Sequence, residues 1–397
     1  MDNQKSKKSW GAFVLGMVVG LLVSLIIIGV IFRGSVGVGN DSFLDAEALE
    51  KVSELEKILH KRFYLSEVTE EQLEEGIFRG MIDSLDDPYS EYYTPEELEE
   101  LLNQSEGIYY GIGAYVSEDT DTNLPKISGI IEGAPSEEAG LRADDLIYAV
   151  DGQSTYGMEL SDAVALIKGP EGTEVTLTII REGESEYLDI TVTRRQVESP
   201  TVEYEMLEDN IAHIEITEFD EVTVAQFEKA LNDAEADGME SLILDLRGNP
   251  GGNMSAVVEI SRMLLPKGLI VYTEDKSGKR VEYTCDGKNQ LQVPLAVLID
   301  GNSASASEIL AGAIQDHGVG TLVGTTTYGK GIVQQIVALD DGSAIKITIS
   351  AYYTPNGRDI HGIGIEPDVE CKFDAEAYYD EENPYDNQLE KAKEILK

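Results

Sequence analysis

The sequence is poor in cysteine. Its 397 residues include only two, Cys285 and Cys371. Two cysteines form at most one bridge, and these two lack the close spacing of zinc-ligand pairs. A disulfide framework and a structural zinc centre are therefore excluded, while the sequence leaves open whether the two cysteines pair. We expect neither a metal nor another cofactor.

Basic residues are also scarce. Lysine and arginine number 30 against 75 acidic residues, which gives a formal net charge of −45. A surface of this sign repels the phosphates of nucleic acids, so DNA and RNA are not expected as partners. The 42% of hydrophobic and 26% of charged residues are typical of a globular chain. At about 150 residues per domain, the length predicts two or three domains.

One stretch near the N-terminus has no charge. It runs for 23 residues, from Trp10 to Phe32, and a helix of that length reaches about 34 Å, enough to cross a bilayer. Three lysines precede it: Lys5, Lys7 and Lys8. The positive-inside rule then predicts a cytoplasmic N-terminus at residues 1–9, an uncleaved signal anchor at residues 10–32, a linker at residues 33–42 and export of the rest. The alternative is a cleaved signal peptide, but its apolar region is shorter, and no A-x-A-like cleavage site follows here.

Residues 43–105 have the pattern of a small helical module. Leucine and valine recur at steps of three to five residues among charges. Asp87-Pro88 and Thr94-Pro95 break the pattern into short helices, and Thr94 fits an N-cap with Glu97 at the third helical position. The module predicts packing or self-association rather than chemistry, and a homo-oligomer is one expected outcome.

Residues 106–195 change to short strands and turns. Gly111-Ile112-Gly113 precedes an alternating strand, and Asp151-Gly152 and Gly169-Pro170 mark later turns. This order of signals resembles a PDZ domain of the bacterial protease type. In such a domain the loop amides bind the carboxylate of a peptide C-terminus, and an exposed strand edge pairs with the peptide. The alternative is a small β-rich domain with ordinary turn glycines.

Residues 196–375 alternate between strands and helices, which predicts an α/β domain with a mainly parallel sheet. Residues 376–397 begin acidic and tyrosine-rich and end in a helical pattern. The predicted fold class is therefore α+β and multidomain: a transmembrane helix, a helical module, a β-rich domain of PDZ type and an α/β core.

The first of two strand–loop–helix junctions in the core is rich in glycine. The strand Leu242 to Arg247 leads into Gly248-Asn249-Pro250-Gly251-Gly252, and a helix follows. Backbone amides at such a helix start bind an anion, either a phosphate or an oxyanion. Neither G-x-G-x-x-G nor the P-loop Gly-Lys-Ser/Thr is present, so support for nucleotide binding is weak. The alternative is a tight turn that requires glycine.

The second junction delivers serines to the start of a helix. The strand Leu295 to Ile299 is followed by Ser303-Ala304-Ser305-Ala306-Ser307-Glu308. The alanines leave room for a substrate carbonyl, and the helix N-terminus offers amides to a developing oxyanion. The alternative is structural, because Ser305 and Glu308 also fit a capping box.

A nucleophilic serine needs a base, and no Gly-x-Ser-x-Gly elbow is present. The four histidines are His60, His213, His317 and His361. The first two lie in helical and strand patterns and are expected to be structural, whereas the last two lie in turn-like contexts and stay candidates. Lys330 is the other candidate, because it lies between glycines and residues 319–337 contain no acid. Desolvation would lower its pKa toward about 7–8, where the neutral amine accepts a proton. The alternative is an exposed turn lysine.

Considered together and in chain order, these motifs resemble the C-terminal processing peptidases, also called tail-specific proteases, over about residues 43–372. The motifs that carry the resemblance are Leu85-Asp86-Asp87-Pro88-Tyr89-Ser90, Asp245-Leu246-Arg247, Asn249-Pro250-Gly251-Gly252, Ser303-Ala304-Ser305-Ala306-Ser307-Glu308-Ile309, Tyr328-Gly329-Lys330-Gly331, Gln334, Tyr353-Thr354-Pro355-Asn356-Gly357-Arg358 and Gly364-Ile365-Glu366-Pro367-Asp368.

The resemblance implies a role for individual residues. Ser305, the middle serine, is the implied nucleophile, and Lys330 is the implied general base. Gln334 would orient the lysine. The backbone amides of Ala306 and Gly251 would form the oxyanion hole. The core would have the crotonase/Clp-protease type of α/β fold.

The resemblance also implies where a substrate tail binds. The loop Gly111, Ile112 and Gly113 would hold its carboxylate. The family often carries arginine where this chain has Lys168, and lysine keeps the charge but loses bidentate geometry. At Lys168 the chain therefore departs from the family pattern, at a position that would report a bound tail.

The expected function is that of a membrane-anchored serine endopeptidase with a Ser–Lys dyad. It would recognise C-terminal tails of exported proteins through its PDZ domain and cleave them outside the cytoplasm. The alternatives are an inactive PDZ scaffold or sensor that binds protein C-termini, and a nucleotide-binding enzyme that uses the Gly251 loop.

Overall fold

A computed structural model describes residues 45–380 and 383–397. The chain falls into two compact units, residues 1–78 and residues 79–397. The predicted membrane segment, residues 10–32, lies outside the described residues. Within the described ranges, no helix combines the length and the apolar character needed to span a bilayer.

The first unit contains α2 (Ala46–Arg62) and the start of α3 (Glu70–Asp83). The Asp45 carboxylate accepts a hydrogen bond from the Ala48 N–H and so caps α2. Neither α2 nor α3 has a buried residue, and Leu49 and Leu55 of α2 are each more than half exposed. The expected helices are present, and several of their apolar side chains are exposed.

The core of the second unit is a six-stranded sheet. Its strands in spatial order are β10 (Val202–Met206), β11 (Ile211–Ile216), β12 (Ser241–Asp245), β15 (Leu295–Ile299), β16 (Thr321–Gly324) and β19 (Val369–Glu370). Only β10 pairs antiparallel, and the other pairs are parallel. A 3₁₀ turn, Glu208–Asn210, joins β10 to β11. The mainly parallel α/β core is therefore present as expected.

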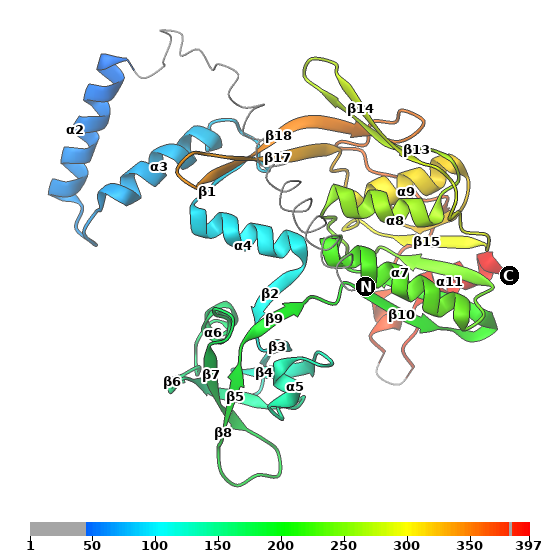
Figure 1. Cartoon of the computed structure of the whole chain (residues 1–397), viewed down its shortest axis with the longest axis horizontal. Helices are drawn as coiled ribbons and strands as arrows, with labels where there is room; N and C mark the ends of the chain where they lie inside the picture. Colours follow the sequence, from blue (N-terminus) through cyan, green and yellow to red (C-terminus); the bar gives the residue numbers. More distant parts are fainter. Residues whose placement is uncertain (1–44, 381–382) are drawn as a thin grey trace, which may run out of the picture. The chain divides into compact units, whose positions relative to one another are not determined.

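Helices cover both faces of this sheet, so its central strands are wholly buried. One face is covered by α7 (Glu221–Ala236), α8 (Met254–Leu264) and α9 (Ala306–His317), as Figure 1 shows. Alternate residues of the sheet such as Leu244 and Val297 pack on this side. The other face packs against α11 (Asn387–Leu396) through Ile243 and Leu298. A short helix, α10 (Ala375–Tyr378), precedes α11.

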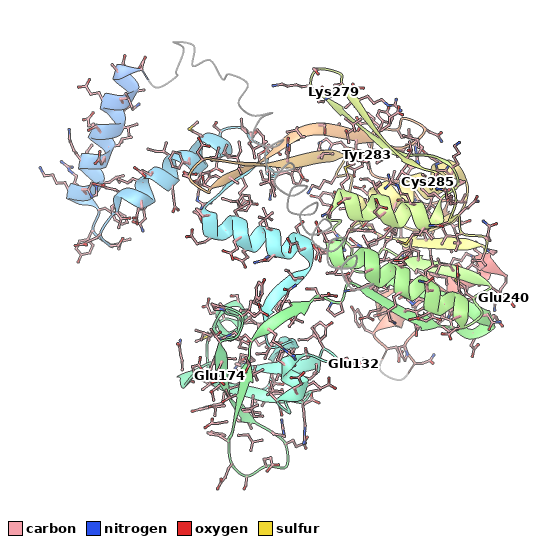
Figure 2. The ribbon with its side chains drawn as sticks, viewed as in Figure 1. Glu132, Glu174, Glu240, Lys279, Tyr283 and Cys285 are labelled. Atoms are coloured by element: carbon pink, nitrogen blue, oxygen red, sulfur yellow. The ribbon has the colours of Figure 1, made fainter. Side chains whose placement is uncertain are left out.

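A second, antiparallel sheet has the order β1-β18-β13-β14, with β17 on the free side of β18. Its strands are β1 (Glu91–Tyr93), β13 (Gly268–Asp275), β14 (Arg280–Cys285), β17 (Ile332–Ala338) and β18 (Ala344–Tyr353). Cys285, labelled at the end of β14 in Figure 2, is buried. Both it and Cys371 are free thiols.

Strand β1 interrupts the segment that the sequence predicts as purely helical. Its residues Tyr92 and Tyr93 are buried, and Glu91 to Tyr93 pair with Ala344 to Lys346 of β18. The helical pattern is otherwise correct, since α4 (Pro95–Glu106) begins with the predicted Thr94 cap, closed by Glu97. The exception arises because pairing with a distant strand determines a three-residue strand, and no local pattern signals it.

The segment that resembles a PDZ domain forms a third sheet. The sheet has the order β3-β4-β5-β7-β8, with β6 on β5, and β2 pairs separately with β9. The elements are β2 (Ile108–Gly111), β3 (Ala114–Asp119), β4 (Leu124–Ile130), α5 (Pro135–Glu138), β5 (Leu146–Val150), β6 (Gln153–Ser154), α6 (Leu160–Ile167), β7 (Glu174–Ile180), β8 (Leu188–Thr193) and β9 (Arg195–Glu198). Its core is separate from that of the six-stranded sheet.

Candidate active site

Ser305 lies where the chain turns from the loop after β15 into α9. Its backbone has φ 53° and ψ −110°, a conformation that costs a non-glycine residue of order 1–3 kcal/mol. The neighbouring loop holds it there, because a Cβ atom at Gly251 would lie only 2.7 Å from Cβ of Ser305. Gly251 itself has φ 108°, so glycine is required at that position. A strained turn at the start of a helix is an arrangement that exposes a nucleophilic hydroxyl.

The three serines of the motif differ in what their hydroxyls do. Ser303 and Ser307 are fully buried. Ser303 Oγ donates to the Leu246 carbonyl at 2.7 Å, and Ser307 Oγ lies 3.1 Å from the Asn249 carbonyl. Ser305 is partly exposed and forms a capping box with Glu308, but among the described residues its hydroxyl donates no hydrogen bond. Ser305 is therefore the serine whose hydroxyl is free to attack.

The glycine loop supplies amides beside Ser305. Asn249 is buried and organises the loop: its Nδ2 donates to the Ile216 carbonyl, and its Oδ1 accepts from the Gly251 N–H at 2.8 Å. The Gly251 amide, predicted to serve the oxyanion hole, is thus engaged in this conformation. The amides of Ala306 and Gly252 have no acceptor among the described residues. Ala306 therefore offers the predicted donor, and Gly252 is the second free amide of the site.

Lys330 follows β16 in the loop that leads to β17. Its Nζ lies 4.5 Å from the centroid of the Tyr89 ring, within range of a cation–π contact. The pKa of Lys330 is lowered, first by burial and then by the charge of Lys346, while Asp87 opposes the shift. Within the described part of the chain, Lys330 Nζ forms no hydrogen bond with Ser305. The ammonium group therefore rests on Tyr89 in this conformation.

The buried carboxylate of Glu308 joins the serine turn to the lysine loop. Its Oε2 accepts from the N–H groups of Ser305 at 2.9 Å and Lys330 at 2.8 Å. Its Oε1 accepts from the Thr327 hydroxyl at 2.6 Å and the Gly329 N–H at 2.7 Å. The capping interpretation captured only the bond to Ser305. The other three bonds position the backbone that carries Lys330.

Tyr352 of β18 makes a second link between the same two segments. Its hydroxyl lies 2.9 Å from the carbonyl oxygen of Ser305 and also contacts the carbonyl oxygen of Lys330. Burial, and then the charge of Glu308, raise the pKa of Tyr352 well above its usual value, so the hydroxyl stays a donor. No local pattern signals this role, because Tyr352 lies in a strand pattern.

The remaining predicted residues lie at different distances from this centre. Gln334 lies on β17, where its Nε2 donates to Thr348 Oγ1 at 3.3 Å rather than to Lys330. His317 is at the far end of the 12-residue helix α9, about 18 Å along the axis, and its Nε2 contacts the Leu269 carbonyl. His361 lies nearer, because a Cβ atom at Gly331 would be 2.6 Å from its backbone nitrogen.

The other two histidines lie in structural settings. His60 lies on α2. His213 is largely enclosed, with Nδ1 3.1 Å from Glu205 and Nε2 3.4 Å from Asp245. Although burial acts in the opposite direction, these two carboxylates raise its pKa. Both histidines fit the structural roles expected of them.

The predicted tail-binding loop lines a groove of about 540 Å³, to which Gly111, Ile112 and Lys168 contribute. The carbonyls of Ile112 and Gly113 accept hydrogen bonds from Ser136, which fixes the loop. The amides of Ile112 and Gly113 have no acceptor among the described residues. Lys168 Nζ lies 5.9 Å from the centroid of the Tyr109 ring. Two free amides near a cation suit a carboxylate.

Comparison with known proteins identifies the family. Residues 210–371 match the family model described as peptidase family S41. The carboxyl-terminal-processing protease of Synechocystis sp. is 35% identical over 320 residues, which cover 80% of this chain and 75% of that protein. The chain belongs to the carboxyl-terminal processing proteases of family S41. It is therefore a serine-type peptidase, as the motifs predicted.

Other comparisons extend over most of the protease. The carboxy-terminal processing protease CtpA of Bacillus subtilis is 36% identical over 342 residues, 84% of this chain and 73% of that protein. Residues 126–181 match a PDZ domain, which confirms that prediction, and residues 35–97 match a model described as the activating protease CtpB N-terminal domain. A solved putative S41 protease from Bacteroides fragilis has the same fold, with a TM-score of 0.53, 17% identity and coverage of 90% of this chain and 98% of that one.

The protease motif Asp245-Leu246-Arg247 has a structural task that sequence reasoning missed. Arg247 contacts the buried Asp245 carboxylate at 2.6 Å and Asp386 at 2.9 Å, so it ties the end of β12 to the start of α11. Although burial works the other way, hydrogen bonds from His213 and Arg247 lower the pKa of Asp245. This ion cluster fixes the end of β12, from which the glycine loop starts.

Proposed function

We propose that the protease is a membrane-anchored serine endopeptidase that cleaves exported proteins near their C-termini, with Ser305 and Lys330 as its catalytic dyad. One observation carries the proposal. Of the three serines, Ser305 is the one whose hydroxyl donates no hydrogen bond, and Glu308 bonds the backbones of Ser305 and Lys330 to one carboxylate.

The chemistry follows from these positions. Neutral Lys330 takes the proton of Ser305 Oγ as that oxygen attacks the scissile carbonyl carbon. The oxyanion that forms receives hydrogen bonds from the Ala306 amide and from an amide of the Gly251-Gly252 loop. The protonated lysine then gives its proton to the leaving amine, and an acyl-enzyme remains. Water, deprotonated by the same lysine, hydrolyses it.

The dyad requires a movement of one side chain. Lys330 Nζ must leave the face of the Tyr89 ring to reach Ser305 Oγ, and Gln334 would then orient the amine from β17. The cation–π contact is worth about 0.5–2 kcal/mol, which rotation of a lysine side chain can overcome when substrate binding favours the new position. Tyr89 is therefore the proposed resting place of the catalytic lysine.

Substrate tails are proposed to bind through the PDZ domain, with the carboxylate on the free amides of Ile112 and Gly113. We expect that converting the C-terminal carboxylate of a good substrate to an amide lowers kcat/KM about tenfold or more, because a charged hydrogen bond of about 1.5–3 kcal/mol is lost. The measurement is cleavage of paired peptides by the full-length protease.

A Ser305→Ala variant is the control for that measurement. It should cleave neither peptide, and yet bind the carboxylate form more tightly than the amide form. Cleavage that persists in this variant would contradict the dyad. Equal turnover of the two peptides by the unsubstituted protease would show instead that the PDZ domain does not read the carboxylate.

Membrane anchoring through residues 10–32 is part of the proposal, with residues 1–9 in the cytoplasm and the peptidase outside. The support is the 23-residue uncharged run and the lysines before it. A proteinase added outside intact cells should digest the chain beyond residue 33. Protection of that part, with an accessible N-terminus, would reverse the orientation.

The predicted domain limits belong to the same proposal: a helical module at 43–105, a PDZ domain at 106–195, a peptidase core at 196–375 and a C-terminal segment at 376–397. The exposed apolar side chains of α2 and α3 support self-association through the helical module.

A further inference from the structure

Two acidic residues lie in the groove that is proposed to hold the substrate tail. The groove is lined mainly by residues 108–168, and Glu218 and Asp220 of the loop between β11 and α7 complete it. Within the described part of the chain, neither carboxylate forms an ion pair within 4.0 Å. The groove therefore has two carboxyl groups without an ion-pair partner, and Lys168 lines the same groove.

Asp220 is the more unusual of the two. Its side chain is only 5% exposed, and a buried carboxylate normally has charged or hydrogen-bonding partners. Asp220 is the N-cap of α7 and forms a capping box with Thr223, whose hydroxyl accepts from the Asp220 N–H at 2.9 Å. The capping box supplies a backbone N–H but no positive charge. Burial, and then the charge of Glu218, raise the pKa of Asp220 to about 7 despite the favourable helix N-terminus.

The loop that carries these acids also contacts the active site. Phe219, which lies between them, donates its N–H to the Gly251 carbonyl at 2.8 Å. Its own carbonyl accepts from the Asn253 N–H, and a Cβ atom at Gly252 would lie 2.4 Å from it. The acidic pair therefore lies at the part of the tail groove that adjoins the loop beside Ser305. A tail that spans both sites must pass it.

We propose that Glu218 and Asp220 select substrates with a lysine or arginine between the bound C-terminus and the scissile bond. This rests on the proposed function, because it requires the tail to lie in the groove. A side-chain cation supplies the ion-pair partner that both carboxyl groups lack. A calcium ion is a poorer occupant, because it takes six to eight oxygen ligands and two side chains supply too few.

The experiment compares cleavage of unstructured peptides by the full-length protease in detergent. All peptides share one C-terminus and one cleavage site, and a single lysine or glutamine is placed at each position between them. We expect lysine to raise kcat/KM about tenfold at one or two adjacent positions, mainly through a lower KM. Glu218→Gln should reduce this preference, and Glu218→Gln with Asp220→Asn should remove it.

Glu221→Gln is the matched control. Glu221 lies next to Asp220, is exposed and does not line the groove, so the variant changes the net charge equally and should keep the tenfold preference. Asparagine is a good N-cap, so Asp220→Asn should fold, and the exposed Glu218 gives a second, independent variant.

Three results would overturn the inference. The first is equal cleavage of the lysine and glutamine peptides, and the second is the same gain from lysine at every position. The third is a loss of the lysine preference in Glu221→Gln as large as the loss in Glu218→Gln. The last two would show only general attraction to an acidic protein. Absence of any Ser305-dependent cleavage would overturn the proposed function and this inference together, whereas efficient cleavage without preference would overturn this inference alone.

Discussion

Replacing Lys330 with arginine should abolish peptide cleavage as completely as replacing it with alanine. The proposed base accepts a proton only when its amine is neutral, and a guanidinium stays protonated at any workable pH. Loss of a general base lowers kcat by about 10²–10⁴-fold. The loop should still fold in both variants, because Glu308 bonds to the backbone N–H of residue 330 and not to its side chain. Steady-state kinetics and thermal unfolding of each variant test this.

The histidines provide the contrast. His317→Ala and His361→Ala should keep substantial turnover. The turnover of Gln334→Ala should lie between that of these variants and that of Lys330→Ala, because the Gln334 side chain would orient the amine without carrying a proton. His361 is the sharper control, since its backbone packs against Gly331. An active Lys330→Arg together with an inactive His361→Ala would replace the dyad with a Ser–His mechanism.

The pH dependence of cleavage by the unsubstituted protease should also indicate a lysine base. Burial lowers the pKa of Lys330, so the neutral amine becomes abundant at a lower pH than for an ordinary lysine. A base is active when deprotonated, and kcat/KM should therefore rise with pH through that lowered pKa of the free enzyme. An activity that falls over this range would contradict a lysine base.

Glu308→Gln should be nearly as damaging although Glu308 touches no reacting atom. Its two carboxylate oxygens accept two hydrogen bonds each. In glutamine an NH₂ group, which is a donor, replaces one of the two oxygens. Two buried donors then lose their acceptor, at about 1–3 kcal/mol each. Misplacement of the lysine loop by about 1 Å is expected to lower kcat about 10²-fold, with a smaller change in KM.

Thr327→Val tests the same network more gently, because it removes one of the four donors and leaves the backbone bonds in place. Its loss of kcat should be smaller than that of Glu308→Gln, while Glu366→Gln, at an exposed position, should have no effect. A Glu308→Gln variant with normal kcat and a normal unfolding temperature would show that the carboxylate does not position the site.

Much of this site could be predicted from the sequence because its elements follow local patterns. The strand before Asp245 and the strand before Asp300 are continuous apolar runs, and each leads into a loop whose glycines or small residues identify it. Ser305 and Lys330 stand out within such loops. The helix and strand boundaries of the core follow from the same periodicities.

The residues that sequence reasoning missed act across long distances. Glu308 matched a local cap, so its bonds to residues 327, 329 and 330 had no local signal. Tyr352 reaches Ser305 from a strand 47 residues away. Tyr89 lies upstream of the PDZ domain, and only folding brings its ring to Lys330. The engagement of the Gly251 amide by Asn249 depends on a side-chain rotamer, which no pattern records.

The short strand β1 has a consequence for when the protease can become active. Its residue Glu91 contacts Lys346, which lies 255 positions later in the chain, and Tyr89 enters the site from the turn just before it. Closing so large a loop is entropically costly and slow. Because the chain is synthesised from its N-terminus, Ser305 and Lys330 are made before β18, the strand that pairs with β1. The nascent enzyme thus carries its nucleophile and base for some time without the surroundings of the lysine, and the order of synthesis delays the completion of the catalytic centre until the last antiparallel strand has been made.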